Sequence, residues 1–230
     1  MSYRVNAVFD TATDPAPIRD RVRGLTSRKI SRFLDAASFA PFLAAMSCYR
    51  ADPAQPPEHV ALYTVGGWDG NMPDQPSQSD GSPDSDALIS RHILEEANPV
   101  DWLRMLSNNP LCQVSIAEGF RGPNAHLVGG PDALAQVLAV AATDLRRGAA
   151  RQAIIVAYDT DRADRGNPSG RAPTSAAALS LVLDDGENDG EDMVSRLFDV
   201  AEEMAPGADS ALDVLRACLA AVPVASGATT

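Results

Sequence analysis

The chain has 230 residues, of which 45% are hydrophobic and 22% charged, a composition typical of a folded protein with a substantial core. Its length fits one large domain or two very small ones. The formal net charge of −12 argues against a nucleic-acid or anionic-membrane partner, because phosphate groups are bound by clustered cations.

The cysteines and the apolar segments of the chain indicate which structural features to expect. Cys48, Cys112 and Cys218 are odd in number and far apart, and no C-x-x-C pair exists, so we expect neither a zinc site nor a disulfide framework. The first residues lack the apolar run of a signal peptide, and no stretch approaches the roughly 18 apolar residues of a membrane span. We therefore expect a cytoplasmic protein with no metal, no cofactor and no membrane span.

The N-terminal part of the chain alternates between strand and helix patterns. Apolar residues alternate over 4–9, which predicts a short strand, and recur at helical spacing over 27–49, where Pro41 should kink or split the helix. The almost wholly apolar segment 59–65 predicts a strand buried on both faces. Residues 67–90 are rich in Gly, Pro, Ser and Asp, which predicts a flexible loop.

The middle of the chain contains the clearest helix. Residues 99–106 favour a short helix, whereas 111–120 could be helix or strand on pattern alone. Residues 124–128 predict a short strand that ends at a Gly-Gly turn. A strong amphipathic helix follows over 131–147, because Pro131 suits the first helical position and the apolar residues behind it form one face.

Two strands and two helices complete the chain. Strands are predicted over 152–157 and 177–183, and amphipathic helices near 193–204 and 210–222, followed by a disordered tail of small residues. Because strands alternate with helices, the pattern predicts a single α/β domain over 1–230 with a largely parallel sheet.

A search for catalytic residues finds little. The histidines are His59, His92 and His126, and none lies in an H-E-x-x-H pattern; neither G-x-S-x-G nor a G-x-G-x-x-G after a strand occurs. No two soft ligands fall at metal-ligand spacing. Each histidine taken alone is more often structural than catalytic.

The segment 119–148 strongly resembles the β-ketoacyl synthases of the thiolase-like superfamily. Those enzymes carry G-L-R-G-P-N/S, a short strand, a nucleophilic cysteine at the start of a long helix, and an I-R-x-G-like motif before a buried strand. Here G-F-R-G-P-N begins at Gly119, and R-G ends the helix at Gly148 without a gap. Weaker matches in the same order, such as R-K-I-S-R-F over 28–33 and A-A-A-L-S-L-V-L over 176–183, extend the resemblance over about 3–185.

The resemblance implies a ketosynthase N-terminal-like domain, the half of a thiolase-like fold with a mixed, mostly parallel five-stranded sheet flanked by helices. Two departures bear on activity. Pro131 stands where the nucleophilic cysteine is expected, and proline offers no nucleophile. The family's catalytic histidines lie in a C-terminal half, and none of this chain's histidines sits in such a motif.

The resemblance therefore implies a ketosynthase-like pseudoenzyme similar to the chain-length-factor subunits of aryl polyene-type systems. Such a subunit would form a heterodimer with a full-length β-ketoacyl synthase, meet acyl carrier protein only indirectly, and act in polyketide or fatty-acid-like biosynthesis. The alternative is a free-standing homodimer that binds acyl groups or acyl carrier protein without condensing them. An arginine patch formed by Arg146, Arg147 and Arg151 would then attract the acidic carrier protein.

The resemblance also implies two sets of contact residues. Residues before the G-L-R-G-P motif line the partner's acyl tunnel in this family, and their matches here are Met105, Leu106, Asn109 and Cys112. The alternative is that Met105 and Leu106 fill this chain's own core, and that Cys112 is inert and buried rather than a substitute nucleophile. The strand before the nucleophile pairs with its equivalent across the family's dimers, which makes the interface strand Asn124, Ala125, His126, Leu127 and Val128.

Overall fold

A five-stranded sheet forms the centre of the computed structural model, which describes residues 2–13, 17–49, 56–66, 82–91, 95, 100, 103, 106–160, 174–184 and 193–222. The strand order is β1-β5-β4-β2-β3. The strands are β1 Ser2–Asp10, β2 Val60–Gly66, β3 Asn124–Val128, β4 Gln152–Thr160 and β5 Thr174–Asp184. Met105, His92 and the expected C-terminal tail lie outside the described residues.

The sheet is mixed, as the family resemblance implied. β2 runs parallel to both β3 and β4, whereas β5 runs antiparallel to both β4 and β1. The mostly parallel arrangement therefore holds for the three strands connected through helices, but not for β5 and β1. Parallel neighbours need a crossover, and the chain makes one through a helix between β2 and β3 and another between β3 and β4.

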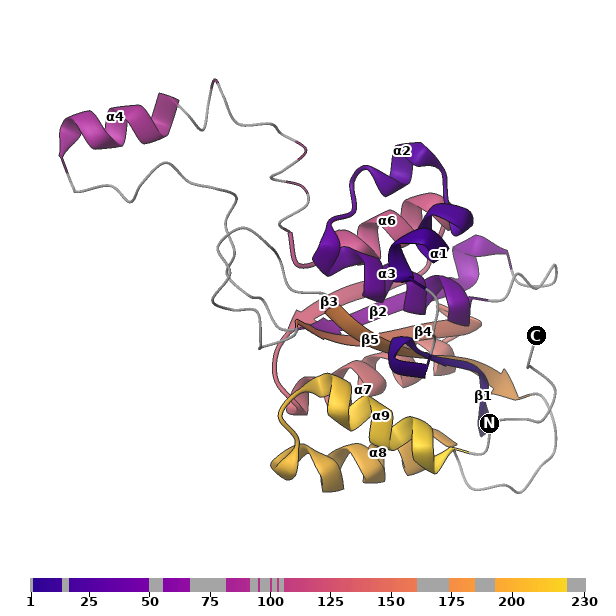
Figure 1. Cartoon of the computed structure of the whole chain (residues 1–230). Coiled ribbons are helices and arrows are strands. Elements are labelled where there is room, and N and C mark those ends of the chain that lie inside the picture. Colours follow the sequence, from indigo (N-terminus) through magenta and orange to yellow (C-terminus); the bar gives the residue numbers. More distant parts are fainter. Residues whose placement is uncertain are drawn as a thin grey trace.

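Helices cover both faces of the sheet (Figure 1). On one face lie α1 Ile18–Leu25, α2 Arg28–Ser31, α3 Ala36–Cys48 and α6 Asn109–Glu118. On the other face lie α7 Asp132–Arg146, α8 Met193–Met204 and α9 Ala211–Ala221, so the two C-terminal helices belong to the packed body of the protein. Short 3-10 helices span Thr11–Thr13, Pro57–His59 and Ala205–Gly207. Among the described residues, no helix has the length and apolar character needed to cross a membrane.

Each face of the sheet has its own apolar core, because successive strand residues point to opposite faces. Along β2, Tyr63 and Val65 belong to the core shared with α7, α8 and α9, whereas Val60 and Leu62 belong to the core shared with α3 and α6. Strand β2 is buried throughout, as its apolar sequence predicted. The resulting three-layer arrangement is the α/β architecture that the sequence predicted.

Two local predictions change. The segment 27–49 is split, but at Arg32–Leu34 rather than at Pro41, which lies inside α3. The reason is a cap: the Asp35 carboxylate accepts a hydrogen bond from the Ser38 backbone N–H at 2.8 Å and starts a new helix.

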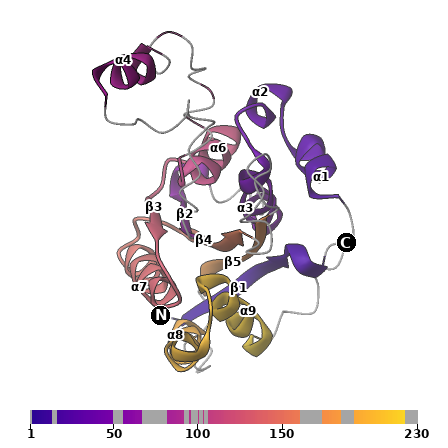
Figure 2. The ribbon, with the colours of Figure 1, turned by 60° about the vertical axis from the view of Figure 1, so that its left-hand side comes forward.

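The loop expected over 67–90 contains a helix, α4 Pro83–Arg91, which stands apart from the sheet in Figures 1 and 2. Its Asp-rich first turn suits a helix start.

Candidate functional site

The candidate site lies at the carboxyl ends of the parallel strands β2, β3 and β4, next to the start of α7. Ligands of open α/β sheets bind at this edge, because the loops that follow parallel strands converge there. Backbone contacts join the elements: the Gly129 N–H donates to the Gly66 carbonyl at 3.4 Å. Figure 2 shows β3 at one edge of the sheet, between α6 and α7.

Tyr158, near the end of β4, ties this edge to the segment before α6. Its hydroxyl donates to the Ser107 carbonyl at 2.7 Å. Its ring lies directly over Gly66, where a Cβ atom would overlap the ring carbons. Glycine is therefore required at the end of β2, because only a residue without a side chain lets Tyr158 cross it.

A hydrogen-bonded pair formed by Thr64 and His126 lies beside Tyr158. The register of β2 and β3 places Thr64 opposite His126, and the Thr64 hydroxyl shares a hydrogen bond of 2.7 Å with His126 Nδ1. The His126 ring stacks with the Tyr158 ring at a centroid distance of 6.1 Å. His126 Nε2 is buried and has no hydrogen-bond partner among the described residues.

The surroundings of His126 favour its neutral form. Burial lowers the pKa of His126 below its usual value of 6.5, and this outweighs the hydrogen bond to Thr64 that favours the charged ring. A hydroxyl next to a neutral imidazole has the geometry of a nucleophile and its base. Thr64, however, is only 2% exposed, so this hydroxyl faces the core rather than a substrate.

Pro131 precedes the first residue of α7 and already has a helical backbone conformation, with φ −51° and ψ −42°. The Leu134 N–H donates to the Pro131 carbonyl at 3.2 Å, so proline stands at the start of α7, as its N-cap residue rather than at the first helical position that the sequence predicted. The side chain of proline contains only carbon and hydrogen, so it can neither attack a thioester nor be activated by the helix dipole.

Strand β3 is an edge strand. Its five residues pair with β2 on one side, and no described strand pairs with the other. Ala125, His126 and Leu127 are half-buried, and Val128 is 57% exposed. An edge of this kind offers unpaired backbone groups beside apolar side chains, which is a template for adding a further strand.

The predicted tunnel residues have different surroundings. Leu106 is 53% exposed, so it does not fill this chain's own core. Asn109 is 3% exposed and held inside the chain: its amide donates to the Phe33 carbonyl at 2.8 Å and its oxygen accepts from Gln113 at 3.2 Å. Cys112 is half-buried, and burial raises the pKa of its thiol above the usual value, which opposes a role as a nucleophile. Met105 lies outside the described residues.

The predicted arginine patch lies at the other end of the strands. Arg146, Arg147 and Arg151 are exposed, and the Arg151 N–H donates to the His59 carbonyl, just before β2 begins, at 2.8 Å. The patch is therefore separated from the start of α7 by the length of the sheet. Among the described residues, no group of three or more His, Cys, Asp or Glu side chains could hold a metal ion.

Sequence reasoning missed Thr64 and Tyr158. Thr64 lies in the segment 59–65, which the sequence predicted to be a buried strand, and a polar side chain in such a strand needs a partner. The sequence therefore indicated that Thr64 needs a hydrogen-bond partner. It could not identify that partner, because only the register of β2 against β3 brings Thr64 opposite His126. Tyr158 lies one residue beyond the predicted strand 152–157, because β4 extends to Thr160.

No family model matches the chain, and no curated protein does. Among solved structures, a complex of a type II polyketide acyl carrier protein with its ketosynthase bound to the hexaketide (AntDE:AntF) is similar, with a TM-score of 0.55 and 15% identity over 79% of this chain and 62% of that chain. The ishigamide ketosynthase/chain length factor has a TM-score of 0.49 and 12% identity over 88% and 67% of the two chains. A ketosynthase in complex with its chain length factor from Xenorhabdus doucetiae has a TM-score of 0.48 and 15% identity over 81% of each.

The chain has a ketosynthase-like fold. The match with a TM-score of 0.55 shows this, and it confirms the thiolase-like α/β half that the motifs of 119–148 implied. The chain spans less than two thirds of the length of that matched chain. At 15% identity the similarity shows the fold alone.

Proposed function

We propose that this chain is a non-catalytic partner subunit of a β-ketoacyl-ACP synthase, which pairs with a catalytic ketosynthase and shapes the tunnel for its growing acyl chain. The observation that carries the proposal is the edge strand β3, which leads directly into α7, and the N-cap residue of this helix is Pro131 rather than a nucleophile. The reaction itself then belongs to the partner.

Pro131 argues for the non-catalytic role. Condensation needs a thiolate at the start of this helix, and proline can supply none. Two other candidates are excluded by their surroundings: Cys112 has a thiol pKa raised by burial, and the Thr64 hydroxyl is enclosed in the core. The surroundings of Cys112 and Thr64 therefore support a role in which this chain supplies no nucleophile.

Strand β3 would bind the partner. Its outer edge can accept a strand of the ketosynthase through backbone hydrogen bonds, which continues one sheet through both subunits. Val128 and the half-buried Leu127 would add apolar burial on the two faces of the joint. The backbone hydrogen bonds and the apolar burial form only when a partner strand covers the outer edge of β3, and both favour pairing.

Among the predicted tunnel residues that the structure describes, Leu106 is best suited to line the partner's tunnel. It is exposed and apolar, and it is followed directly by Ser107, which Tyr158 holds through its carbonyl. A side chain on an anchored backbone limits the length of an acyl chain by steric exclusion. Asn109 is engaged by its own chain, so any contribution from it is to position α6.

The matched complex contains an acyl carrier protein and a hexaketide, which supports a substrate class of carrier-bound polyketide chains. Fatty-acid-like chains and aryl polyenes, which the resemblance of the sequence implied, belong to the same proposal. In this proposal the carrier protein docks on the ketosynthase and meets this chain only indirectly. A homodimer that binds carrier protein through Arg146, Arg147 and Arg151 is the alternative outcome of the test.

The test is co-expression of the tagged chain with a full-length ketosynthase from the same genome, followed by size-exclusion chromatography and product analysis. We expect a one-to-one complex with condensation activity that the ketosynthase lacks alone. Val128→Lys should abolish co-elution, because a lysine at a strand edge opposes pairing. Met204→Lys, at an exposed apolar position on α8, is the matched control and should leave the complex intact.

Leu106→Trp tests the tunnel in the same complex. We expect shorter products from a complex that still assembles, because the larger side chain reduces the space for the acyl chain. An unchanged product length would show that Leu106 does not line the tunnel. A stable homodimer that ignores the ketosynthase would instead favour the acyl- or carrier-binding alternative.

A further inference from the structure

A basic pocket lies on the face of the sheet opposite α7, away from the edge formed by β3. It has a volume of about 510 Å³ and is formed by α1, α2, the turn between them and the start of α3. Its lining residues are Arg19, Arg23, Thr26, Arg28, Ser31, Arg32, Leu34 and Phe39. A volume of this size is in the range of pockets that hold small molecules.

The charge around this pocket is opposite to that of the whole protein. Residues 18–34 contain six cations and a single carboxylate, Asp20, a formal charge of +5, whereas the chain carries −12. Asp20 lies 3.8 Å from Arg23 in an exposed pair, and Arg19 and Arg28 make no ion pair among the described residues. Like charges gathered in one pocket repel each other, and an anion bound among them removes that repulsion.

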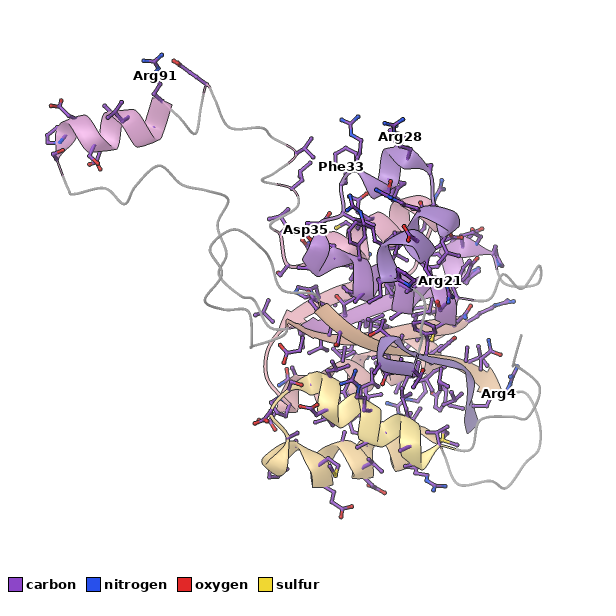
Figure 3. The ribbon with its side chains drawn as sticks, viewed as in Figure 1. Arg4, Arg21, Arg28, Phe33, Asp35 and Arg91 are labelled. Carbon is purple, nitrogen blue, oxygen red and sulfur yellow. The ribbon has the colours of Figure 1, made fainter. Side chains whose placement is uncertain are left out.

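Arginine favours a particular class of anion. The guanidinium group is a planar fork that donates two parallel hydrogen bonds, and phosphate oxygens match that fork. Thr26 adds a hydroxyl donor to the same wall. Figure 3 shows Arg28 at the outer end of α2, pointing away from the sheet, where it can close over a ligand that has entered.

The floor of the pocket is apolar. Leu34 is buried in the core between the sheet and α3, and Phe39 packs against that core from α3. A ligand that reaches this floor gains from burying an apolar group, while inorganic phosphate alone leaves the floor wet. The combination of an arginine rim with a floor of Leu34 and Phe39 selects a molecule that has both parts.

We propose that the pocket formed by Arg19, Arg23, Arg28, Arg32, Leu34 and Phe39 is a binding site for a small organic phosphate ester, with the phosphate at the arginine rim and an apolar or aromatic body against the floor. The site is separate from strand β3, so it does not depend on the proposed function. It accounts for an arginine-rich surface on an acidic protein.

Isothermal titration calorimetry with phenyl phosphate tests the site in the full chain. We expect phenyl phosphate to bind more tightly than inorganic phosphate, and phenol not to bind measurably, because only phenyl phosphate contacts both rim and floor. Added salt should weaken the binding. The double substitution Arg19→Gln/Arg28→Gln should weaken it by about tenfold or more, since charge-assisted hydrogen bonds are lost.

The matched control is Arg146→Gln/Arg147→Gln, which removes the same charge from the exposed end of α7 and should leave the affinity within about twofold, since distant exposed charges are screened. If the two double variants weakened the binding of phenyl phosphate equally, the binding would depend only on overall charge, and the proposal would be overturned. So would the absence of binding at millimolar phenyl phosphate. Amide chemical shifts of the unaltered protein give a second measurement: changes at Thr26 and Ser31 are expected, and changes confined to other residues contradict the site.

Discussion

His126 is a titratable group in a place that suits only its neutral form. Its Nδ1 shares a hydrogen bond with Thr64, its Nε2 is buried without a described partner, and its ring faces Tyr158. Protonation would put a positive charge on this partly buried ring and leave its Nε2–H without an acceptor, which is costly. The residue therefore stabilises the β2–β3 pair at neutral pH and opposes it in acid.

The sign of the pH dependence follows from this pKa shift. Because burial lowers the pKa of His126 in the folded protein, the unfolded chain binds its proton first as the pH falls. The stabilisation is complete above the unfolded pKa near 6.5 and is lost as the pH falls below it. Asparagine can keep the hydrogen bond to Thr64 without titrating.

We predict that His126→Asn reduces the loss of unfolding free energy between pH 7.5 and pH 5.5. Urea denaturation at the two pH values measures it, and an NMR titration of the His126 ring should give a pKa below 6.5. An equal pH dependence in both proteins, or a ring pKa above 6.5, would show that the imidazole is not desolvated as the structure indicates.

At the scale of elements, one ion pair joins the first strand to the last helix. Arg216 of α9 donates to both carboxylate oxygens of Asp10 at the end of β1, at 2.8 and 3.0 Å. Burial alone would raise the pKa of Asp10, but the hydrogen bonds from Arg216 and from the Ala12 N–H hold it below its usual value. A two-pronged, partly buried contact of this kind is stronger than an exposed ion pair.

Asp10→Asn should lower the unfolding free energy by about 1 kcal/mol at pH 7, because a charge-assisted contact becomes a neutral one. The difference from the unaltered protein should disappear as the pH falls through the lowered pKa of Asp10, since the carboxyl is then protonated in both states. Asp20→Asn is the matched control: its exposed contact with Arg23 is 3.8 Å long, and its effect should be much smaller. Equal effects in the two variants would mean that the contact with Arg216 adds nothing.

At the scale of the whole molecule, the sheet joins two cores. Phe42 of α3 is fully buried on one face and Leu215 of α9 on the other. Strand β2 sends alternate residues to the two faces, so neither core can loosen without exposing the strand that serves the other. Cooperative unfolding as one unit is therefore expected.

We predict that Leu215→Ala and Phe42→Ala each shift the same urea transition, by about 2–5 kcal/mol, because each opens a cavity in a packed core. Coincident fluorescence and circular dichroism curves with an unchanged slope would confirm one unit. An early, separate transition in Leu215→Ala would show instead that α8 and α9 unfold by themselves.

Strong local patterns allowed most elements to be predicted. The helix that begins at Pro131 was predicted because its cap, apolar face and ending all lie within one short segment, and its structure agrees. The motif glycine Gly122 also has a direct cause: a Cβ there would overlap the backbone of Val60. Where two local signals competed, as between Asp35 and Pro41, the sequence placed the break at the wrong one.

The sequence by itself determined the alternation of strands and helices, the burial of β2 and the absence of a nucleophile at Pro131. Each of these depends on residues a few positions apart, or on a single side chain. The tertiary structure alone decided the pairing of Thr64 with His126, the contact of Asp10 with Arg216 and the pocket between α1, α2 and α3. Those depend on strand register and helix packing, which the long-range burial of apolar surface sets and which no local period encodes.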